Sequence, residues 1–291
     1  MNGPRLTRRW LAAGALALLV VVVAAFWFVF FRGDTPAPVS IGAGLEQLQE
    51  DLASERDTTP DPPPSRDDAD SGSEPDSEPD SGPDPGADSG SEPDPGPDPG
   101  PPTGGAADGT WIVDDEFGEF DFDTASGSFA GFRVDEELTV GEVTAVGRTG
   151  GVTGSLIIDD STLVAAEITV DMTTIESNDF RRENAIRGAV RASVYPTATF
   201  VLTEPVQLDV DALESGATHE VEAVGDLTVN GTANQVSFHL HPTIVEPGLG
   251  LIVGHTEIFW SDFGVTAPRA PIVVSVADHG IVEFQLLVRR Q

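Results

Sequence analysis

The sequence contains no cysteine and no lysine, and it has a single tyrosine. Without cysteine the chain has no disulfide framework, no thiolate metal site, no cysteine nucleophile and no lipobox cysteine for acylation. Positive charge is also scarce, because fifteen arginines face 49 acidic residues and the formal net charge is −34. A surface this acidic repels phosphate backbones, so we expect no nucleic-acid partner.

Motifs for catalysis or metal binding are equally scarce. The sequence has no nucleophile-elbow motif, and no glycine-rich loop is followed by the lysine that a phosphate site requires. His239 and His241 share the spacing of some metal ligands, but they alternate with Phe238 and Leu240 and should therefore face solvent. We expect no enzyme, no metal and no cofactor; a hydrolytic or metal-dependent enzyme is the less favoured alternative.

The longest apolar run covers residues 10–31, which are 22 residues without one charge. As a helix it would measure about 33 Å, enough to cross a hydrocarbon core of about 30 Å. Three arginines in residues 1–9 precede it and only Arg32 follows closely, which favours a cytoplasmic N-terminus. We predict a single-pass anchor in the cell membrane with the remaining chain on the extracytoplasmic side. A cleaved signal peptide is the alternative, although its apolar region is normally shorter.

A short juxtamembrane segment follows at residues 32–56. Leu45, Leu48 and Leu52 fall at helical spacing, which predicts one amphipathic helix. Such a helix would be marginal alone in water. We therefore expect it to rest on the membrane or on a neighbouring chain.

Residues 57–109 change character completely. They contain fourteen prolines and fifteen acidic residues against Arg66, in repeated SEPD, PDPG and DSG units without apolar periodicity. Such a segment cannot bury enough surface to offset its chain entropy, so we expect a disordered, extended linker. Its simplest interpretation is a spacer that holds the following domain off the membrane. Binding of Ca²⁺ or of cell-wall polymers by its carboxylates are the alternatives.

Residues 110–291 are long enough for one domain with a substantial core. Apolar and polar residues alternate along about eight segments, the pattern of half-buried antiparallel strands. Glycine-rich joints at residues 148–151 and 214–216 indicate hairpin turns. One helix of about a dozen residues is expected after Ser177 or Asn178, which can cap it. The pattern fits both a closed barrel and a two-layer sandwich, and periodicity does not separate them.

The alternation also predicts which side chains point inward. The inward set carries no charge and consists of Phe132, Val134, Ile168, Val170, Phe200, Leu202, Leu227, Val229, Phe238, Leu240, Phe284 and Leu286. An eight-stranded barrel either fills with its own side chains or holds one small ligand. A cavity lined by this set would favour an apolar guest, whereas a filled core would suit a ligand-free interaction module displayed on a stalk.

Three sequence blocks resemble the bacterial YceI-like family. They are the strand, helix and strand of residues 171–200, GDLTVNG at residues 225–231 and SDFGV at residues 261–265. The resemblance spans most of the chain after Trp111, and the order and spacing of the blocks make it specific. It implies an all-β, lipocalin-like antiparallel barrel with one or two helices.

The same resemblance implies a partner. YceI-like proteins are associated with polyisoprenoid lipids, so the inward set becomes the expected site for a polyprenyl or quinone-like chain. Arg182-Glu183 resembles an arginine-aspartate pair of the family, whereas Phe259 and Trp260 stand where the family has asparagine and arginine. These departures remove polar groups near the expected mouth of the barrel.

Overall fold

The computed structural model describes residues 35–58 and 107–291, except 115–116, 125, 140 and 217–218. Contacts divide the chain into one unit of residues 1–52 and 104–291 and a second unit of residues 53–103, of which only 53–58 are described. The predicted membrane span and most of the acidic linker lie outside the described residues. Within the described part, no helix combines the length and apolar character that a membrane crossing requires.

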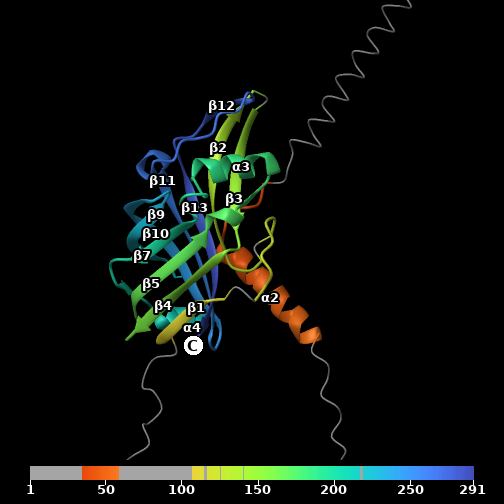
Figure 1. The fold of residues 1–291 in the computed structure, drawn as a ribbon. Coiled ribbons are helices and arrows are strands. Elements are labelled where there is room, and N and C mark those ends of the chain that lie inside the picture. The colour runs from red at the N-terminus through yellow and green to blue at the C-terminus, as the bar shows by residue number, and fades with distance from the viewer. Residues whose placement is uncertain (1–34, 59–106, 115–116, 125, 140, 217–218) are drawn as a thin grey trace, which may run out of the picture. The chain divides into compact units, whose positions relative to one another are not determined.

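The folded unit is built mainly from strands (Figure 1). Its helices are α2 (Ile41–Thr58), η1 (Met172–Thr174), α3 (Phe180–Ala189), α4 (Val210–Ser215) and η2 (Trp260–Phe263). Its strands are β1 (Gly109–Val113), β2 (Phe129–Leu138), β3 (Gly141–Thr149), β4 (Val152–Asp159), β5 (Thr162–Asp171), β6 (Glu176–Ser177), β7 (Thr197–Leu202), β8 (Val206–Gln207), β9 (Val221–Val229), β10 (Thr232–Glu246), β11 (Leu249–Phe259), β12 (Val273–Val276) and β13 (His279–Arg290).

Eight strands close into a ring in the order β1, β4, β5, β7, β9, β10, β11 and β13, and β13 pairs back onto β1. All of these pairings are antiparallel. The long strand β13 also pairs with β2, which continues the sheet into β3 and β6. The predicted eight-stranded antiparallel barrel with few helices is therefore confirmed, and closure leaves the ring without free edges.

The strand register keeps the apolar side chains on the inside. Phe200 of β7 lies opposite Ile168 of β5 on one side and Leu227 of β9 on the other. Because alternate residues face opposite sides of a strand, these partners point into the barrel together. Ile168 and Phe200 pack against a core cluster that contains Phe238, Leu240 and Leu286, and Phe200 also packs against a second cluster that contains Leu227.

The expected helix is α3, and it begins two residues after the predicted capping region. Arg187 near its end donates to the carbonyl oxygen of Ile175 at 2.9 Å. In Figure 1, α3 lies toward the end of the barrel that also carries β12, opposite α4 and the C-terminus. This end is called the α3 end below.

Both glycine joints differ from the expected hairpins. Gly150 and Gly151 connect β3 to β4, which pair with other strands and not with each other. Gly216 terminates helix α4 in the left-handed conformation, with φ 68°, and its N–H bonds back to the helix. The glycines did indicate where the chain changes direction. They did not indicate which structure would form there, because glycine is also common at helix ends and between strands that do not pair.

Helix α2 packs against the barrel itself. Leu45, Leu48 and Leu52 share a cluster with apolar residues on the outer face of β11 and β13, including Leu251 and Leu287. Leu48 is 2% exposed and Leu251 is fully buried. The expected amphipathic helix therefore exists, but its apolar face contacts the domain rather than a membrane or another chain.

The stretch before α2 is fixed by a buried ion pair. Glu283 of β13 accepts from Arg148 at 2.9 and 3.2 Å, from Arg133 at 3.4 Å and from the N–H of Val39 at 3.2 Å. The two guanidinium groups also donate at 2.7 Å to the carbonyl oxygens of residues 36 and 37. Because Arg148 and Glu283 are almost fully buried, these bonds are needed to compensate the lost hydration of both charges.

This packing bears on the interpretation of the acidic linker. Residues 35–52 lie on the barrel, and the chain returns to it by Ala107, which is 1% exposed and accepts from the indole N–H of Trp111 at 2.8 Å. The segment therefore starts and ends on the same folded unit. The role of the segment as a spacer stays a prediction, and residues 35–52 contact the barrel before the segment begins.

Candidate functional site

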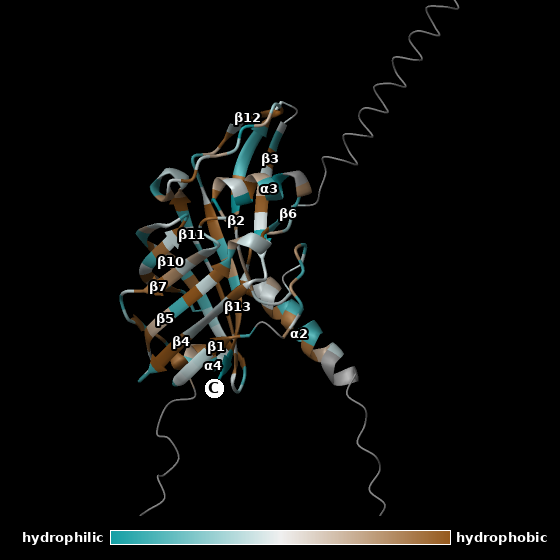
Figure 2. Cartoon of the chain, viewed as in Figure 1, coloured by the Kyte–Doolittle hydropathy of each residue, from teal (hydrophilic) through white to brown (hydrophobic). Residues whose placement is uncertain are grey.

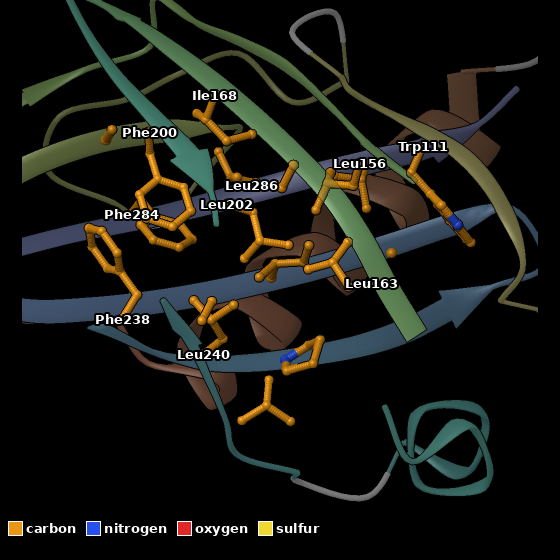
Figure 3. A pocket seen from close by; sticks show the side chains of 18 of the residues that line it. Trp111, Leu156, Leu163, Ile168, Phe200, Leu202, Phe238, Leu240, Phe284 and Leu286 are labelled. Carbon is orange, nitrogen blue, oxygen red and sulfur yellow. The ribbon is translucent and has the colours of Figure 1, made fainter. Parts of the chain in front are cut away.

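The barrel interior contains two apolar cavities. The lower cavity, toward α4, has a volume of about 140 Å³. Figure 3 shows its side chains pointing inward from several strands. Its larger lining residues are Trp111, Leu156, Leu163, Ile168, Phe200, Leu202, Phe238, Leu240, Phe284 and Leu286. An apolar cavity of about 150 Å³ stays dry and can hold a group the size of benzene, so this cavity suits a hydrocarbon group.

The upper cavity lies toward α3 and has a volume of about 170 Å³. Helix α3, η2 and the segment that follows η2 contribute to its wall together with the strands. Its larger lining residues are Phe132, Val134, Met172, Ile175, Ile186, Val190, Val229, Ile258, Trp260, Phe263, Val265 and Val276. Because α3 and η2 belong to two of the blocks identified in the sequence, those blocks form much of the wall at this end.

Five residues line both cavities and mark their boundary: Ala130, Val170, Ala198, Leu227 and Val282. Two of them are alanines, so the boundary is made in part by short side chains. A chain that occupied both cavities would pass this point. Val170, Leu227 and Val282 would have to move to let it pass, because they are the bulkier residues at the boundary.

All twelve residues of the predicted inward set line one cavity or the other. Ile168, Phe200, Leu202, Phe238, Leu240, Phe284 and Leu286 line the lower cavity; Phe132, Val134 and Val229 line the upper one; Val170 and Leu227 line both. The interior therefore holds two small voids among side chains that also pack on one another. The contact of these residues with a lipid remains a prediction.

Aromatic rings shape the lower cavity. Phe238 makes edge-to-face contacts with Phe200, at a centroid distance of 5.2 Å, and with Phe284, at 5.4 Å. Two glycines make room for these rings. A Cβ on Gly225 would lie 2.5 Å from the ring of Phe200, and one on Gly254 would lie 2.4 Å from the ring of Phe284. The rings therefore lie directly over neighbouring strands, and larger residues at these two positions would displace them.

Strand alternation does not predict the lining residues that come from helices and turns. Ile186 and Val190 of the α3 segment, Trp260 and Phe263 of η2, and Leu213 of α4 face the cavities although strand alternation does not apply to them. Ile186 and Val190 are four residues apart, which is the helical spacing of one face. This spacing could have predicted that Ile186 and Val190 face the same side.

Ionisable groups are few at these cavities. Among the described lining residues only Glu136, Arg182 and Glu283 are ionisable. Arg182 contacts Glu136 at 3.0 Å and donates to Asn178 at 3.3 Å. Glu183 instead faces Arg187 at 3.6 Å and lies outside both linings. Trp260, in place of the family's arginine, extends the apolar wall and contacts Phe132 edge to face at 5.8 Å.

The histidines lie outside the cavities. His239 and His241 are partly exposed, and both approach Glu220, at 3.2 and 3.8 Å. The ring of His239 stacks on that of His255 at 5.6 Å. Among the residues that the structure describes, no three acidic or histidine side chains are grouped as a metal site would require.

These features can now be compared with known proteins. The YceI-like domain matches residues 120–288, which is more than half of the chain. The chain belongs to the YceI-like family. In this family member, the three blocks named from the sequence all lie within the matched region. No curated protein matches the chain.

Several solved structures are similar to this YceI-like chain. A polyisoprenoid-binding domain from Saccharophagus degradans is 16% identical, with a TM-score of 0.44, and the match covers 56% of this chain and 94% of that one. BcnA from Burkholderia cenocepacia is 20% identical, with a TM-score of 0.43 and coverages of 55% and 95%. A Campylobacter jejuni YceI protein is 14% identical, with a TM-score of 0.41 and coverages of 50% and 84%.

Proposed function

We propose that this protein binds or carries an isoprenoid-type lipid, polyprenyl or quinone-like, in the barrel interior. The observation that carries the proposal is the pair of adjoining apolar cavities in one YceI-like barrel. Protein interiors are normally packed with few voids larger than water, so two such spaces along one barrel point to a guest. A filled interior, which a ligand-free interaction module predicts, does not account for them.

The chemistry of the lining fits a branched hydrocarbon chain. Each buried methylene contributes about 0.8 kcal/mol, so a few isoprene units bind without polar contacts, less the entropy of ordering the chain. Each cavity has the size of a small hydrocarbon group, which matches a short repeating unit better than a bulky rigid ligand. Arg182 is the cationic residue in the lining of the upper cavity, and a head group there would compete with Glu136 for its guanidinium.

The second part of the proposal concerns location. We infer from residues 10–31 that the protein is a single-pass membrane protein with the barrel on the extracytoplasmic side. The apolar length of this run and the arginines before it support this placement. An anchor would keep the barrel close to the membrane from which isoprenoid lipids are drawn.

Lipid binding is tested on the full chain purified gently from membranes. Organic extraction and mass spectrometry should recover an isoprenoid lipid, and delipidated protein should take up added polyprenol or ubiquinone saturably. Palmitate serves as the unbranched control and should compete weakly. Absence of bound lipid together with non-saturable uptake of every isoprenoid would overturn the proposal. Protease protection of the barrel in sealed vesicles tests the location separately.

A further inference from the structure

The α3 end of the barrel carries an unusual group of exposed apolar residues. Phe180, the first residue of α3, is 74% exposed, Val194 is 63% exposed and Val274 of β12 is 58% exposed. Ile272 lies beside β12 and is also exposed. In Figure 2 the ribbon at this end has mixed colours, with brown at β12 and teal in the adjoining strand β2. Single exposed apolar residues are ordinary, but several at one end of a fold suggest an interaction surface.

This surface adjoins the upper cavity. Ala267, Pro268 and Val276 line the cavity, and Pro268 is itself exposed. The loop that carries the exposed Ile272 therefore forms part of the cavity rim. Ile186 of α3 and Val190, which directly follows α3, line the cavity, while Phe180 is exposed. An apolar partner at this end would meet the point at which the cavity approaches the surface.

The charge of this end is mixed. Residues 180–191 and 266–274 contain five arginines against Glu183. Glu136 and Glu137 of β2 lie opposite β12, and Arg182 is already paired with Glu136 at 3.0 Å. An interaction surface at this end is therefore indicated by its exposed apolar side chains and not by its charge.

The N-terminal chain reaches the domain at the same end. Thr35 and Pro36 lie beside Ser177 and Asn178, immediately before α3. The proposed membrane span ends at Phe31, and four residue steps cover at most about 14 Å. Thr35 is therefore held within about 14 Å of the end of the proposed span, which keeps this end of the barrel near the membrane surface.

We propose that the α3 end of the barrel docks on the bilayer surface, with Phe180, Ile272 and Val274 in the interface and the rim of the upper cavity facing the lipid. Lipid then enters through this end without crossing bulk water. This inference rests on the membrane anchoring proposed above. The docking inference adds the orientation of the barrel, the surface that contacts the bilayer and the route by which lipid enters.

The chain lacks cysteine, so single cysteines can be labelled without background. Full-length Phe180→Cys, Ile272→Cys and Val274→Cys, labelled with a nitrobenzoxadiazole dye, are reconstituted into vesicles of phosphatidylcholine and phosphatidylglycerol. We expect a blue shift at each site and quenching by nitroxide-labelled lipids. Glu214→Cys, exposed in α4 at the opposite end, is the matched control and should show neither effect.

Quenching that is equal at both ends, or absent at all three sites, would overturn the docking. A concentration-dependent shift without lipid quenching would identify a second copy as the partner and would also overturn it. The variant Ile272→Asp/Val274→Asp should lose the quenching at Phe180→Cys and slow polyprenol transfer from vesicles, while binding of polyprenol from detergent stays unchanged. Lost binding in detergent by the unmodified protein would instead refute the lipid function and leave the docking result standing.

Discussion

Arg191 donates to the side-chain oxygen of Asn230, which is buried and adopts a left-handed backbone with φ 56°. The amide nitrogen of Asn230 in turn donates to the carbonyl oxygens of Phe263 and Gly264, at 3.0 and 3.1 Å. One asparagine thus joins the segment after α3, the β9–β10 turn and η2. These are the three blocks that identified the family in the sequence, and the structure brings them together at the α3 end.

Loss of this asparagine should destabilise the α3 end. Asn230→Ala removes the buried hydrogen bonds and places alanine in a left-handed conformation, so we expect a loss of about 2–4 kcal/mol in the free energy of unfolding. Asn234→Ala is the matched control, because its single bond to Asp262 is exposed. Urea unfolding followed by circular dichroism measures both. Equal midpoints for the two variants would contradict the role of Asn230.

A bulky residue at the boundary of the cavities should exclude the lipid. Ala198→Phe fills space shared by both cavities, so binding of polyprenol should weaken at least tenfold, which is about 1.4 kcal/mol. Val201→Phe makes a comparable enlargement on the exposed face of the same strand and should bind normally. Equilibrium titration with a fluorescent polyprenol analogue measures the affinity of both variants. Undiminished binding by folded Ala198→Phe would place the ligand elsewhere.

Removal of the buried carboxylate should be among the most damaging substitutions in the chain. Glu283→Ala leaves Arg148 and Arg133 without their counter-charge, at an expected cost of about 3–5 kcal/mol. Glu257→Ala on the adjoining strand removes an exposed carboxylate and should change stability by less than about 0.5 kcal/mol. Thermal unfolding measures the stability of both variants. A small effect at Glu283 would show that water compensates the two arginines.

The contact of α2 with the barrel is tested at its most buried side chain. Leu48→Ala should cost about 2–5 kcal/mol, because it leaves a cavity against the outer face of β11 and β13. The neighbouring Gln49 is exposed, and Gln49→Ala should have little effect. Hydrogen exchange at Leu251 and Leu287 gives a local readout. If exchange there is unchanged in Leu48→Ala, α2 does not cover this face in solution.

One histidine should titrate above its ordinary range. The hydrogen bond between His279 and the Asp278 carboxylate, at 2.8 Å, favours the imidazolium and raises the pKa of His279 above 6.5. Asp278→Asn removes the negative charge, so the pKa of His279 should fall. NMR titration of the ring carbons of His279 in the protein and in the variant measures the difference. An unchanged pKa in the variant would show that the bond is absent in solution.

The barrel could be predicted because its inner face follows a simple rule. Val236, Phe238 and Leu240 alternate with polar residues, and the alternation alone placed Phe238 and Leu240 correctly beside the cavities. The closure of the sheet into a barrel could not be predicted from alternation. A sandwich has the same period, so the choice of a barrel depended on the resemblance carried by three separated blocks.

The position of α2 could not be predicted by the same rule, although a signal was present. Leu251-Ile252-Val253 and Leu286-Leu287-Val288 are runs of three apolar residues, which break the alternation expected for a strand with one wet face. A strand that is covered on both faces has a continuous run of apolar residues in its sequence. These runs indicated a second layer outside the barrel, but nothing local to them specified that residues 41–52 would supply it.

The attachment of residues 35–52 to the barrel has a consequence for proteolysis. A protease that cuts within residues 59–106 leaves α2 and the strands as two polypeptides that are still held by the Leu48 cluster and by Glu283. The cut would change the mass of the fragments seen under denaturing conditions without separating the barrel from residues 35–52. Separation of the barrel from everything before Thr35 would require a cut before Thr35 or the loss of those contacts.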